Sequence, residues 1–274
     1  MSSIFDSDTL TALATQYGAS YPTASPFPHT VIDNFMDPTL LSSALAEFPS
    51  PEEFQFYKYD NPLEKKLAFD QVSKLPPTIA KILTALNTPL FLTFLEQLTG
   101  IDGLIPDPYY RGGGIHQIES GGKLDVHIDF NRHQKLKLDR RLNALLYLNT
   151  DWEESYGGHF ELWKGHRDGT QHVLESCEQK ILPIFNRFVV FSTSEKSYHG
   201  HPTPLTCPID RTRKSIAIYY YTNGRPADEV APAHSTTFIK RPEDPDTEAL
   251  NTLRESRNKG RLASNITASN TADS

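Results

Sequence analysis

The spacing of apolar side chains divides the chain into a helical first part and a strand-rich second part. In the first part apolar residues recur three or four positions apart, for example over 79–86 and 89–98, as on the buried face of a helix. Asp37 followed by Pro38 is a typical helix start, because the carboxylate caps free backbone N–H groups and proline fits the first turn. We therefore expect residues 1–107 to form a mostly helical support region.

After this region the apolar period falls to two, which is typical of half-buried β-strands. Glycines separate the candidate strands, and few helical patterns interrupt them. The candidate strands cover residues 111–118, 123–130, 143–149, 158–164, 171–175, 179–183, 187–192 and 213–221. Such a run of short strands predicts a mainly β domain, a sandwich or a jelly-roll barrel, over residues 108–224.

Residues 225–274 form a C-terminal extension with lower apolar content. Within it, a polar helix is expected from about residue 246 to residue 259. The end of the chain from Ala263 is rich in Ser, Thr and Asn and has too few apolar side chains to build a core. We expect this last segment to be disordered.

Composition and charge narrow the class of protein. The formal net charge of −7 and the sequence pI near 5.8 disfavour a nucleic-acid partner, because such surfaces are usually basic. Cys177 and Cys207 are far apart and suggest neither a disulfide framework nor a thiolate metal site. No signal peptide and no apolar run of membrane-spanning length is recognised, so we expect a cytoplasmic protein without a membrane partner. No sequence feature predicts the oligomeric state.

Two histidines and an aspartate form the most informative pattern. Residues i and i+2 of a strand share one face, so His127 and Asp129 project together into the predicted barrel. A third candidate, His199, follows the apolar strand at 187–192. Two histidines and one carboxylate with open coordination positions form the facial triad of non-haem Fe(II) oxygenases. Asp125 and His201 are the alternatives, since each shares a face with the residue it would replace.

An arginine begins the last predicted strand. Alternation places Arg213 on the inner face, where a buried guanidinium needs an anion, and its planar fork suits a carboxylate. Tyr147, on another strand, is a candidate neutral donor to the same carboxylate. Arg211 and Lys214 are weaker candidates, because Arg211 fits the preceding loop and Lys214 falls on the opposite face.

The order of these residues resembles that of the prolyl-4-hydroxylase-type 2-oxoglutarate/Fe(II) dioxygenases over about residues 108–222. The motifs that carry the resemblance are His127-x-Asp129, Tyr147-Leu148-Asn149 followed by Trp152, Gly157-Gly158 before a strand ending in Leu162-Trp163, His199-Gly200 and Arg213-x-Ser215. The resemblance implies a double-stranded β-helix, a cupin-like jelly roll, with N-terminal helices. It implies that His127, Asp129 and His199 hold Fe(II), while Arg213 and Tyr147 bind the distal carboxylate of 2-oxoglutarate. Gln117 stands where some relatives have a tyrosine near the oxoacid, and is a further candidate for that contact.

The resemblance also implies the chemistry of an oxidoreductase. A 2-oxoglutarate- and O2-dependent dioxygenase would hydroxylate a substrate C–H bond, with succinate and CO2 as co-products and ascorbate as a possible reductant. The expected substrate is a peptidyl proline, as for the dioxygenases that act on procollagen proline. The alternatives are a free amino acid, lipid or other small molecule and, as a third class, a non-catalytic cupin-like metal-binding protein. Basic residues at 131–141, namely Arg132, Lys135, Lys137, Arg140 and Arg141, favour a peptide with acidic residues near the proline.

Overall fold

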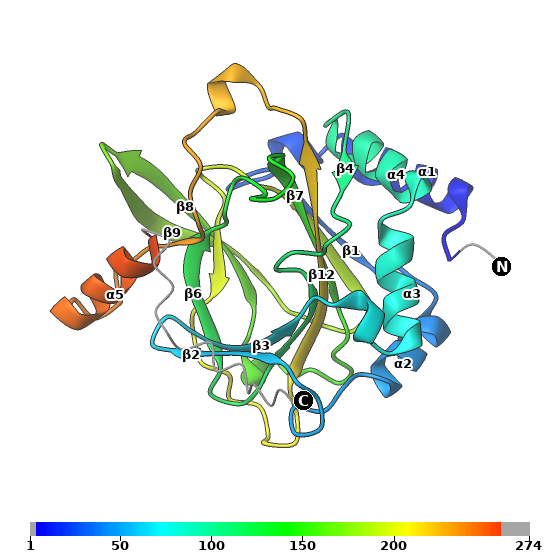
Figure 1. Cartoon of the computed structure of the whole chain (residues 1–274), viewed down its shortest axis with the longest axis horizontal. Helices are drawn as coiled ribbons and strands as arrows, with labels where there is room; N and C mark the ends of the chain where they lie inside the picture. Colours follow the sequence, from blue (N-terminus) through cyan, green and yellow to red (C-terminus); the bar gives the residue numbers. More distant parts are fainter. Residues whose placement is uncertain (1–3, 259–274) are drawn as a thin grey trace, which may run out of the picture.

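A computed structural model describes residues 4–258 and shows an antiparallel sheet curled into a half-barrel, the double-stranded β-helix expected from the sequence (Figure 1). The helices are α1 (Ser7–Gly18), α2 (Pro38–Ala46), α3 (Pro77–Leu86), α4 (Pro89–Thr99) and α5 (Glu248–Asn258), with short 3-10 helices at Tyr21–Thr23, Val72–Lys74, Glu154–Tyr156 and Ala227–Glu229. The strands are β1 (His29–Asp33), β2 (Tyr57–Asn61), β3 (Glu64–Phe69), β4 (Ile105–Pro106), β5 (Gly114–Ile118), β6 (Lys123–Ile128), β7 (Asp139–Tyr147), β8 (Phe160–Asp168), β9 (Gln171–Ile181), β10 (Arg187–Ser192), β11 (Tyr198–His201), β12 (Arg213–Thr222) and β13 (Thr237–Phe238).

The sheet runs in the order β1-β10-β7-β12-β5-β3-β6-β11-β8-β9. Strand β3 pairs with both β5 and β6 and so joins the two halves of the half-barrel. Three further strands attach outside this path: β2 pairs with β3, β4 with β12 and β13 with β6. The curl brings β6 and β11, on one half, to face β7 and β12 on the other.

The two faces of β12 show why the sequence folds in this way. Ile216, Ile218 and Tyr220 pack in one core with α3 and α4, and the Tyr220 hydroxyl donates to the Leu86 carbonyl oxygen of α3 at 2.8 Å. The alternate positions Arg213, Ser215 and Tyr219 line the cavity inside the half-barrel. The apolar face is therefore covered by helices, which leaves the other face of the strand for a polar site.

The first part of the chain is less helical than its apolar pattern predicts. It contains α1–α4, but it also supplies β1, β2 and β3 to the main sheet. Strand β1 lies at the edge beside β10, with Val31 opposite Val189. The support region and the barrel core are thus joined by backbone hydrogen bonds as well as by packed helices.

Two further expectations need correction. The expected strands at 171–175 and 179–183 form the single strand β9, whose pairing with β8 continues through two register shifts. Strand β11, which carries His199, was not expected, because four residues with two histidines and a glycine give no apolar alternation. Strand β10 has the predicted bounds of 187–192.

The C-terminal extension folds back onto the half-barrel. Helix α5 lies within the expected range, and β13 pairs with β6, with Phe238 opposite His127. Asn131 binds the same segment through the Pro232 carbonyl oxygen and the His234 backbone N–H. We call residues 232–239 the C-terminal strap. The prediction of disorder from Ala263 onward falls on residues that lie outside the described part of the chain.

No single helix in residues 4–258 is long and apolar enough to cross a membrane. The pair α3 and α4, bent by 53°, meets the criterion only in length and composition. The buried side chains of both helices pack in the core that covers the outer face of the sheet.

The strap is fixed by an ion pair whose strength depends on pH. His234 Nε2 lies 2.8 Å from a Glu195 carboxylate oxygen. Burial lowers the pKa of His234, but the hydrogen bonds to Glu195 and to the Ser235 carbonyl oxygen, together with the negative charge of Glu195, outweigh this effect and raise the pKa above 6.5. The stabilisation is therefore fully present below about pH 6.5 and is lost as the pH rises through the folded-state pKa.

We predict that His234→Gln lowers the free energy of unfolding by about 1 kcal/mol at pH 6, the size of one charge-assisted contact at a half-buried site. The difference from wild type should shrink at pH 8.5, where the imidazole is neutral. Urea denaturation at both pH values measures it. A difference that grows with pH would contradict the assignment of a charged pair.

Candidate active site

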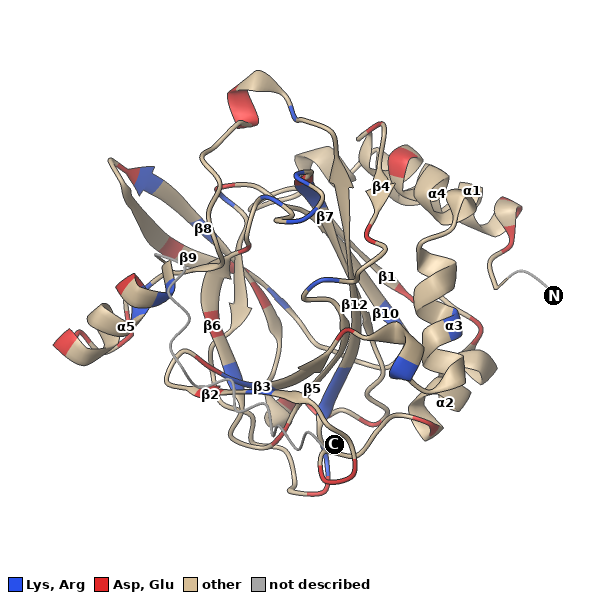
Figure 2. Cartoon of the chain, in the orientation of Figure 1, with Lys and Arg blue, Asp and Glu red and all other residues tan. Residues whose placement is uncertain are grey.

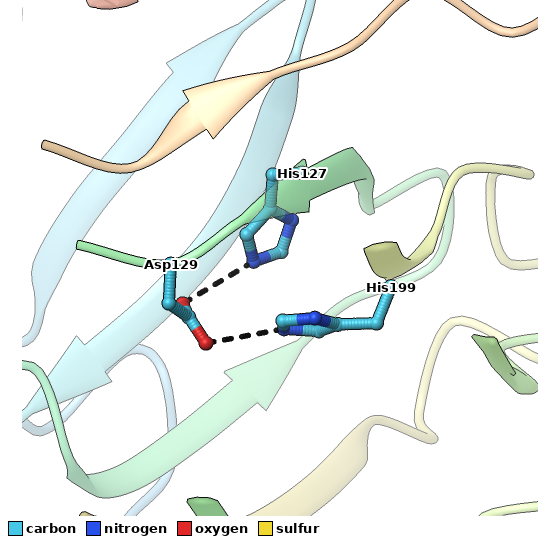
Figure 3. A group of neighbouring side chains, drawn as sticks. All are labelled: His127, Asp129 and His199. Atoms are coloured by element: carbon cyan, nitrogen blue, oxygen red, sulfur yellow. Dashed lines mark ion pairs between the residues drawn. The ribbon is translucent and has the colours of Figure 1, made fainter. Parts of the chain in front are cut away.

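His127, Asp129 and His199 form a buried cluster inside the half-barrel (Figure 3). His127 comes from the end of β6, Asp129 follows that strand, and His199 lies directly opposite His127 on β11. The Nε2 atom of His127 lies 3.6 Å from one Asp129 carboxylate oxygen, and Nε2 of His199 lies 3.3 Å from the other. The potential ligand atoms of all three lie within 4.8 Å of one another, as one bound metal ion requires.

Backbone carbonyl groups fix the orientation of both imidazoles. His127 Nδ1 lies 2.8 Å from the Asp125 carbonyl oxygen, and His199 Nδ1 lies 2.8 Å from that of Ser197. A carbonyl oxygen can only accept, so each Nδ1 carries the proton and each Nε2 is left with a free lone pair. This is the form in which histidine binds a metal ion.

The Asp129 carboxylate is held by two donors that were not anticipated as part of the site. Asn143 Nδ2 donates to Asp129 Oδ2 at 2.7 Å, and an Arg140 nitrogen lies 3.1 Å from the same oxygen. Burial would raise the pKa of Asp129, but Arg140 and His199 lower it, and it lies well below its usual range. The carboxylate is therefore ionised, as metal binding requires.

A β-bulge explains why Arg140 escaped the sequence analysis. The pairing of β7 with β12 shifts register beside Arg140, which puts Arg140 on the same inner face as Asn143. Strict alternation from Asn143 would have placed Arg141 there instead. The Arg140 guanidinium lies over the Tyr219 ring at 3.5 Å and over the Phe130 ring at 4.4 Å. Asn143 did carry a signal, since it is a polar residue within an apolar strand.

Arg213 lines the cavity and contacts the buried hydroxyl of Tyr147. Arg213 Nε donates to the Gly158 carbonyl oxygen at 2.8 Å, and an Arg213 terminal nitrogen lies 3.3 Å from the Tyr147 hydroxyl. Gly158 must lack a side chain, because a Cβ there would meet Arg213 Cδ at 3.0 Å and Leu205 at 2.6 Å. Burial raises the pKa of Tyr147, so its hydroxyl keeps the proton that it would donate.

Arg213 is a buried cation without an anion. Only 5% of its surface is exposed, and no carboxylate in residues 4–258 lies within ion-pair distance. Burial lowers its pKa, and its contacts with Gly158 and Tyr147 are to neutral groups. An unpaired guanidinium in such a place is costly unless a ligand supplies the negative charge.

Gln117 lies away from the cavity. It faces the helical side of β5, as does Ile115, and its amide nitrogen donates to the Thr212 hydroxyl at 2.8 Å. The neighbouring His116 lines the cavity in its place. This placement argues against contact between Gln117 and a co-substrate, and one step along the strand accounts for the difference.

Of the two alternative metal ligands, Asp125 lies outside the cavity, whereas His201 lines it but is not part of the ligand cluster. The Asp125 carboxylate binds Lys123 at 2.7 Å and does not line the cavity. The irregular register between β6 and β11 sets Leu124, not Asp125, opposite His201. Arg211 donates to loop carbonyl groups at Thr150 and Asp151. Burial and the charge of Arg213 hold the pKa of His201 well below its usual range.

The triad and Arg213 share a cavity of about 920 Å³. Its apolar wall includes Phe160 and Phe191, whose rings lie 5.5 and 4.6 Å from that of His199. Its mouth is built from Tyr57, Tyr59 and Lys66 of the β2–β3 hairpin, Arg111, Arg132, residues 233–236 of the C-terminal strap, and Arg257 and Asn258 at the end of α5. The donor set of two imidazoles and a carboxylate suits Fe(II), and the unpaired Arg213 suits the far carboxylate of 2-oxoglutarate.

We predict that Arg140→Leu weakens metal binding by roughly 10- to 100-fold, because groups that orient a ligand typically contribute this much. Arg140→Lys, which keeps the charge but loses the planar fork, should recover part of the affinity. Arg141→Leu is the matched control, since Arg141 is the neighbouring arginine and pairs with Glu229 outside the cavity. Anaerobic titration with Fe(II) measures the affinity, and equal losses in the Arg140→Leu and Arg141→Leu variants would refute the role of Arg140.

Three solved structures illustrate the fold that this chain shares. A prolyl hydroxylase from Trichoplax adhaerens, in complex with a hypoxia inducible factor peptide fragment, is 18% identical with a TM-score of 0.53, covering 78% of this chain and 91% of that one. A prolyl-4-hydroxylase from Pseudomonas putida is 17% identical with a TM-score of 0.51, covering 78% and 100%. The non-haem alpha-ketoglutarate-dependent epimerase SnoN, from nogalamycin biosynthesis, is 13% identical with a TM-score of 0.50, covering 77% and 84%.

The sequence itself gives one match. Comparison with curated proteins finds no relative. Residues 113–221, which include all three triad residues, Tyr147 and Arg213, match the family model described as the 2OG-Fe(II) oxygenase superfamily. Residues 113–221 therefore resemble the 2OG-Fe(II) oxygenase superfamily in sequence, and the chain shares the fold of solved prolyl hydroxylases.

Proposed function

We propose that this protein is an Fe(II)- and 2-oxoglutarate-dependent dioxygenase that hydroxylates a peptidyl proline, with succinate and CO2 as co-products. His127, Asp129 and His199 would hold the iron, and Arg213 with Tyr147 would hold the distal carboxylate of 2-oxoglutarate. Bound iron, with 2-oxoglutarate and O2, would supply the oxidising power for insertion of oxygen into a C–H bond. Ascorbate would serve as the reductant that keeps the iron in the ferrous state.

The chain's own residues have separate tasks in this reaction. The carbonyl groups of Asp125 and Ser197 keep the two imidazoles in the metal-binding tautomer. Arg140 and Asn143 hold the Asp129 carboxylate and occupy one of its oxygens. The aromatic wall beside His199 excludes water from the reacting centre.

The unpaired Arg213 in the same cavity as the triad carries the proposal. A protein that only binds a metal has no use for a buried cation without a counter-ion, since it costs stability. The third class considered, a non-catalytic cupin-like metal-binding protein, leaves Arg213 unexplained. A dicarboxylic co-substrate that bridges the metal and Arg213 explains both features together.

The mouth of the cavity supports a peptide with acidic residues near the proline. Of the basic residues at 131–141, only Arg132 is an exposed cation that lines the cavity. Arg140 is buried against Asp129, and Lys135 stacks on the Tyr109 ring at 3.8 Å. Arg111 is a second exposed cation at the mouth. Positive charge at the rim would attract carboxylates on a peptide.

The size of the cavity favours a second candidate, a small-molecule hydroxylase. The β2–β3 hairpin, the C-terminal strap and the end of α5 all contribute to its wall. The volume of about 920 Å³ falls within the range of small-molecule pockets, which is roughly 300–1,000 Å³. SnoN indicates that this fold also serves enzymes of small-molecule biosynthesis.

We predict that incubation with Fe(II), 2-oxoglutarate and ascorbate adds one oxygen to proline in acidic peptides and less in basic ones. Mass spectrometry locates the oxygen, and succinate release measures coupling. Arg132→Glu should abolish the preference for acidic peptides, whereas Lys135→Glu, which lies outside the cavity, should leave it. Tight succinate release with a free amino acid or lipid, and no oxidised peptide, would replace this substrate with the small-molecule class.

We also predict that Arg213→Ala raises the KM for 2-oxoglutarate about 30-fold or more, because it removes a buried charge-assisted pair that contributes roughly 2–5 kcal/mol. Arg213→Lys should recover part of this loss. Tyr147→Phe should cost on the order of 1 kcal/mol, the contribution of one neutral hydrogen bond. Steady-state succinate release gives the KM values. A stronger effect from Arg211→Ala than from Arg213→Ala would refute the assignment.

A further inference from the structure

His201 is a buried side chain whose ring nitrogens form no hydrogen bond with the described part of the protein. It lies on β11 two residues after His199 and lines the same cavity, with 4% of its surface exposed. Neither ring nitrogen has a hydrogen-bond partner in residues 4–258. A neutral imidazole carries one N–H donor and one acceptor, so at least one donor is left without a partner.

The other inward histidines of the cavity differ in this respect. His127 and His199 each use Nδ1 on a backbone carbonyl oxygen, and His116 Nε2 lies 3.1 Å from the Gly112 carbonyl oxygen. Leaving a buried donor unsatisfied costs free energy, so such a group indicates a partner that the chain does not supply. A side chain such as valine or leucine would fill this wall of the cavity without that cost.

The position of His201 identifies the partner. Strand β11 pairs antiparallel with β8, with His199 opposite Leu162 and Gly200 opposite Glu161, so His201 lies one step further toward Gly158. The Gly158 carbonyl oxygen holds Arg213, and His201 and Arg213 line the same cavity, so the His201 ring lies on the side of the triad that leads to the buried guanidinium. A molecule that reaches from the triad to Arg213 passes along this wall.

We propose that His201 is a specificity-determining residue for the co-substrate: its ring N–H donates to the carboxylate that Arg213 holds. The inference rests on the proposed function and adds to it a third donor for that carboxylate, beside Arg213 and Tyr147. With this donor the pocket selects an oxoacid that carries a second carboxylate over one that ends in a methyl group, because only the carboxylate satisfies all three donors.

The test compares two ligands that differ only in that carboxylate. Isothermal titration of the Mn(II)-loaded protein, without O2, measures the affinities for 2-oxoglutarate and for 2-oxopentanoate. His201→Val should weaken 2-oxoglutarate about tenfold and change 2-oxopentanoate less than twofold. His201→Asn, which restores an N–H donor, should recover part of the loss. His116→Val is the matched control, since its ring is already hydrogen-bonded, and it should shift the 2-oxoglutarate affinity less than His201→Val does.

Other results would contradict either the role of His201 or the proposed function, and the two cases can be told apart. Equal weakening of both ligands by His201→Val, or equal effects of His201→Val and His116→Val, would mean that His201 only maintains the cavity. Loss of Mn(II) binding in His201→Val would make it a metal ligand, contrary to the inference. If the wild-type protein binds Mn(II) but neither oxoacid, the proposed function fails. If it binds 2-oxoglutarate and His201→Val does so equally well, only the role of His201 fails.

Discussion

The packing of α3 and α4 on the outer face of β7, β10 and β12 is the constraint on which the rest of the molecule depends. Each of these strands gives its apolar side chains to that core. Because the outer face of these strands buries enough apolar surface, their inner positions can carry polar side chains. These include Asn143, Tyr147 and Arg213. Burying such groups is tolerable only on a rigid scaffold, where each finds a fixed partner or awaits a ligand.

Acidic and basic positions are interspersed along the ribbon (Figure 2). The charged side chains that define the site are the few that are buried inside the half-barrel. Asp129 lies between the two triad imidazoles and Arg140, so its negative charge is balanced before any metal arrives. Arg213 is not balanced in this way. The site thus has three candidate metal ligands at one end and the unpaired positive charge of Arg213 at the other. A co-substrate that binds both must span this distance and carry a negative charge at the Arg213 end.

Much of this site is predictable from the sequence, since period-two alternation assigns a face to each strand residue. That rule places His127, Asp129, Arg213 and Tyr147 correctly relative to one another. It fails where the backbone departs from regular pairing. Because of the bulge beside Arg140, alternation does not predict that this residue contacts Asp129. Gln117 was chosen from the family pattern, whereas alternation along β5 places it on the face away from the cavity. Strands β1–β3 were not predicted because each has only five or six residues, and β2 and β3 carry charged residues in place of a clear apolar alternation.

The C-terminal strap gives the site a property that the barrel core alone would lack. Strand β13 is hydrogen-bonded to the strand that carries His127, and the Phe238 ring lies 5.7 Å from the His127 ring. Beyond the strap, Arg257 of α5 pairs with Glu64 of β3, and both residues line the cavity. Strand pairing and the ring contact therefore make the strap part of the support of the His127 side chain, so the C-terminal extension completes a site whose candidate ligands all come from the barrel core.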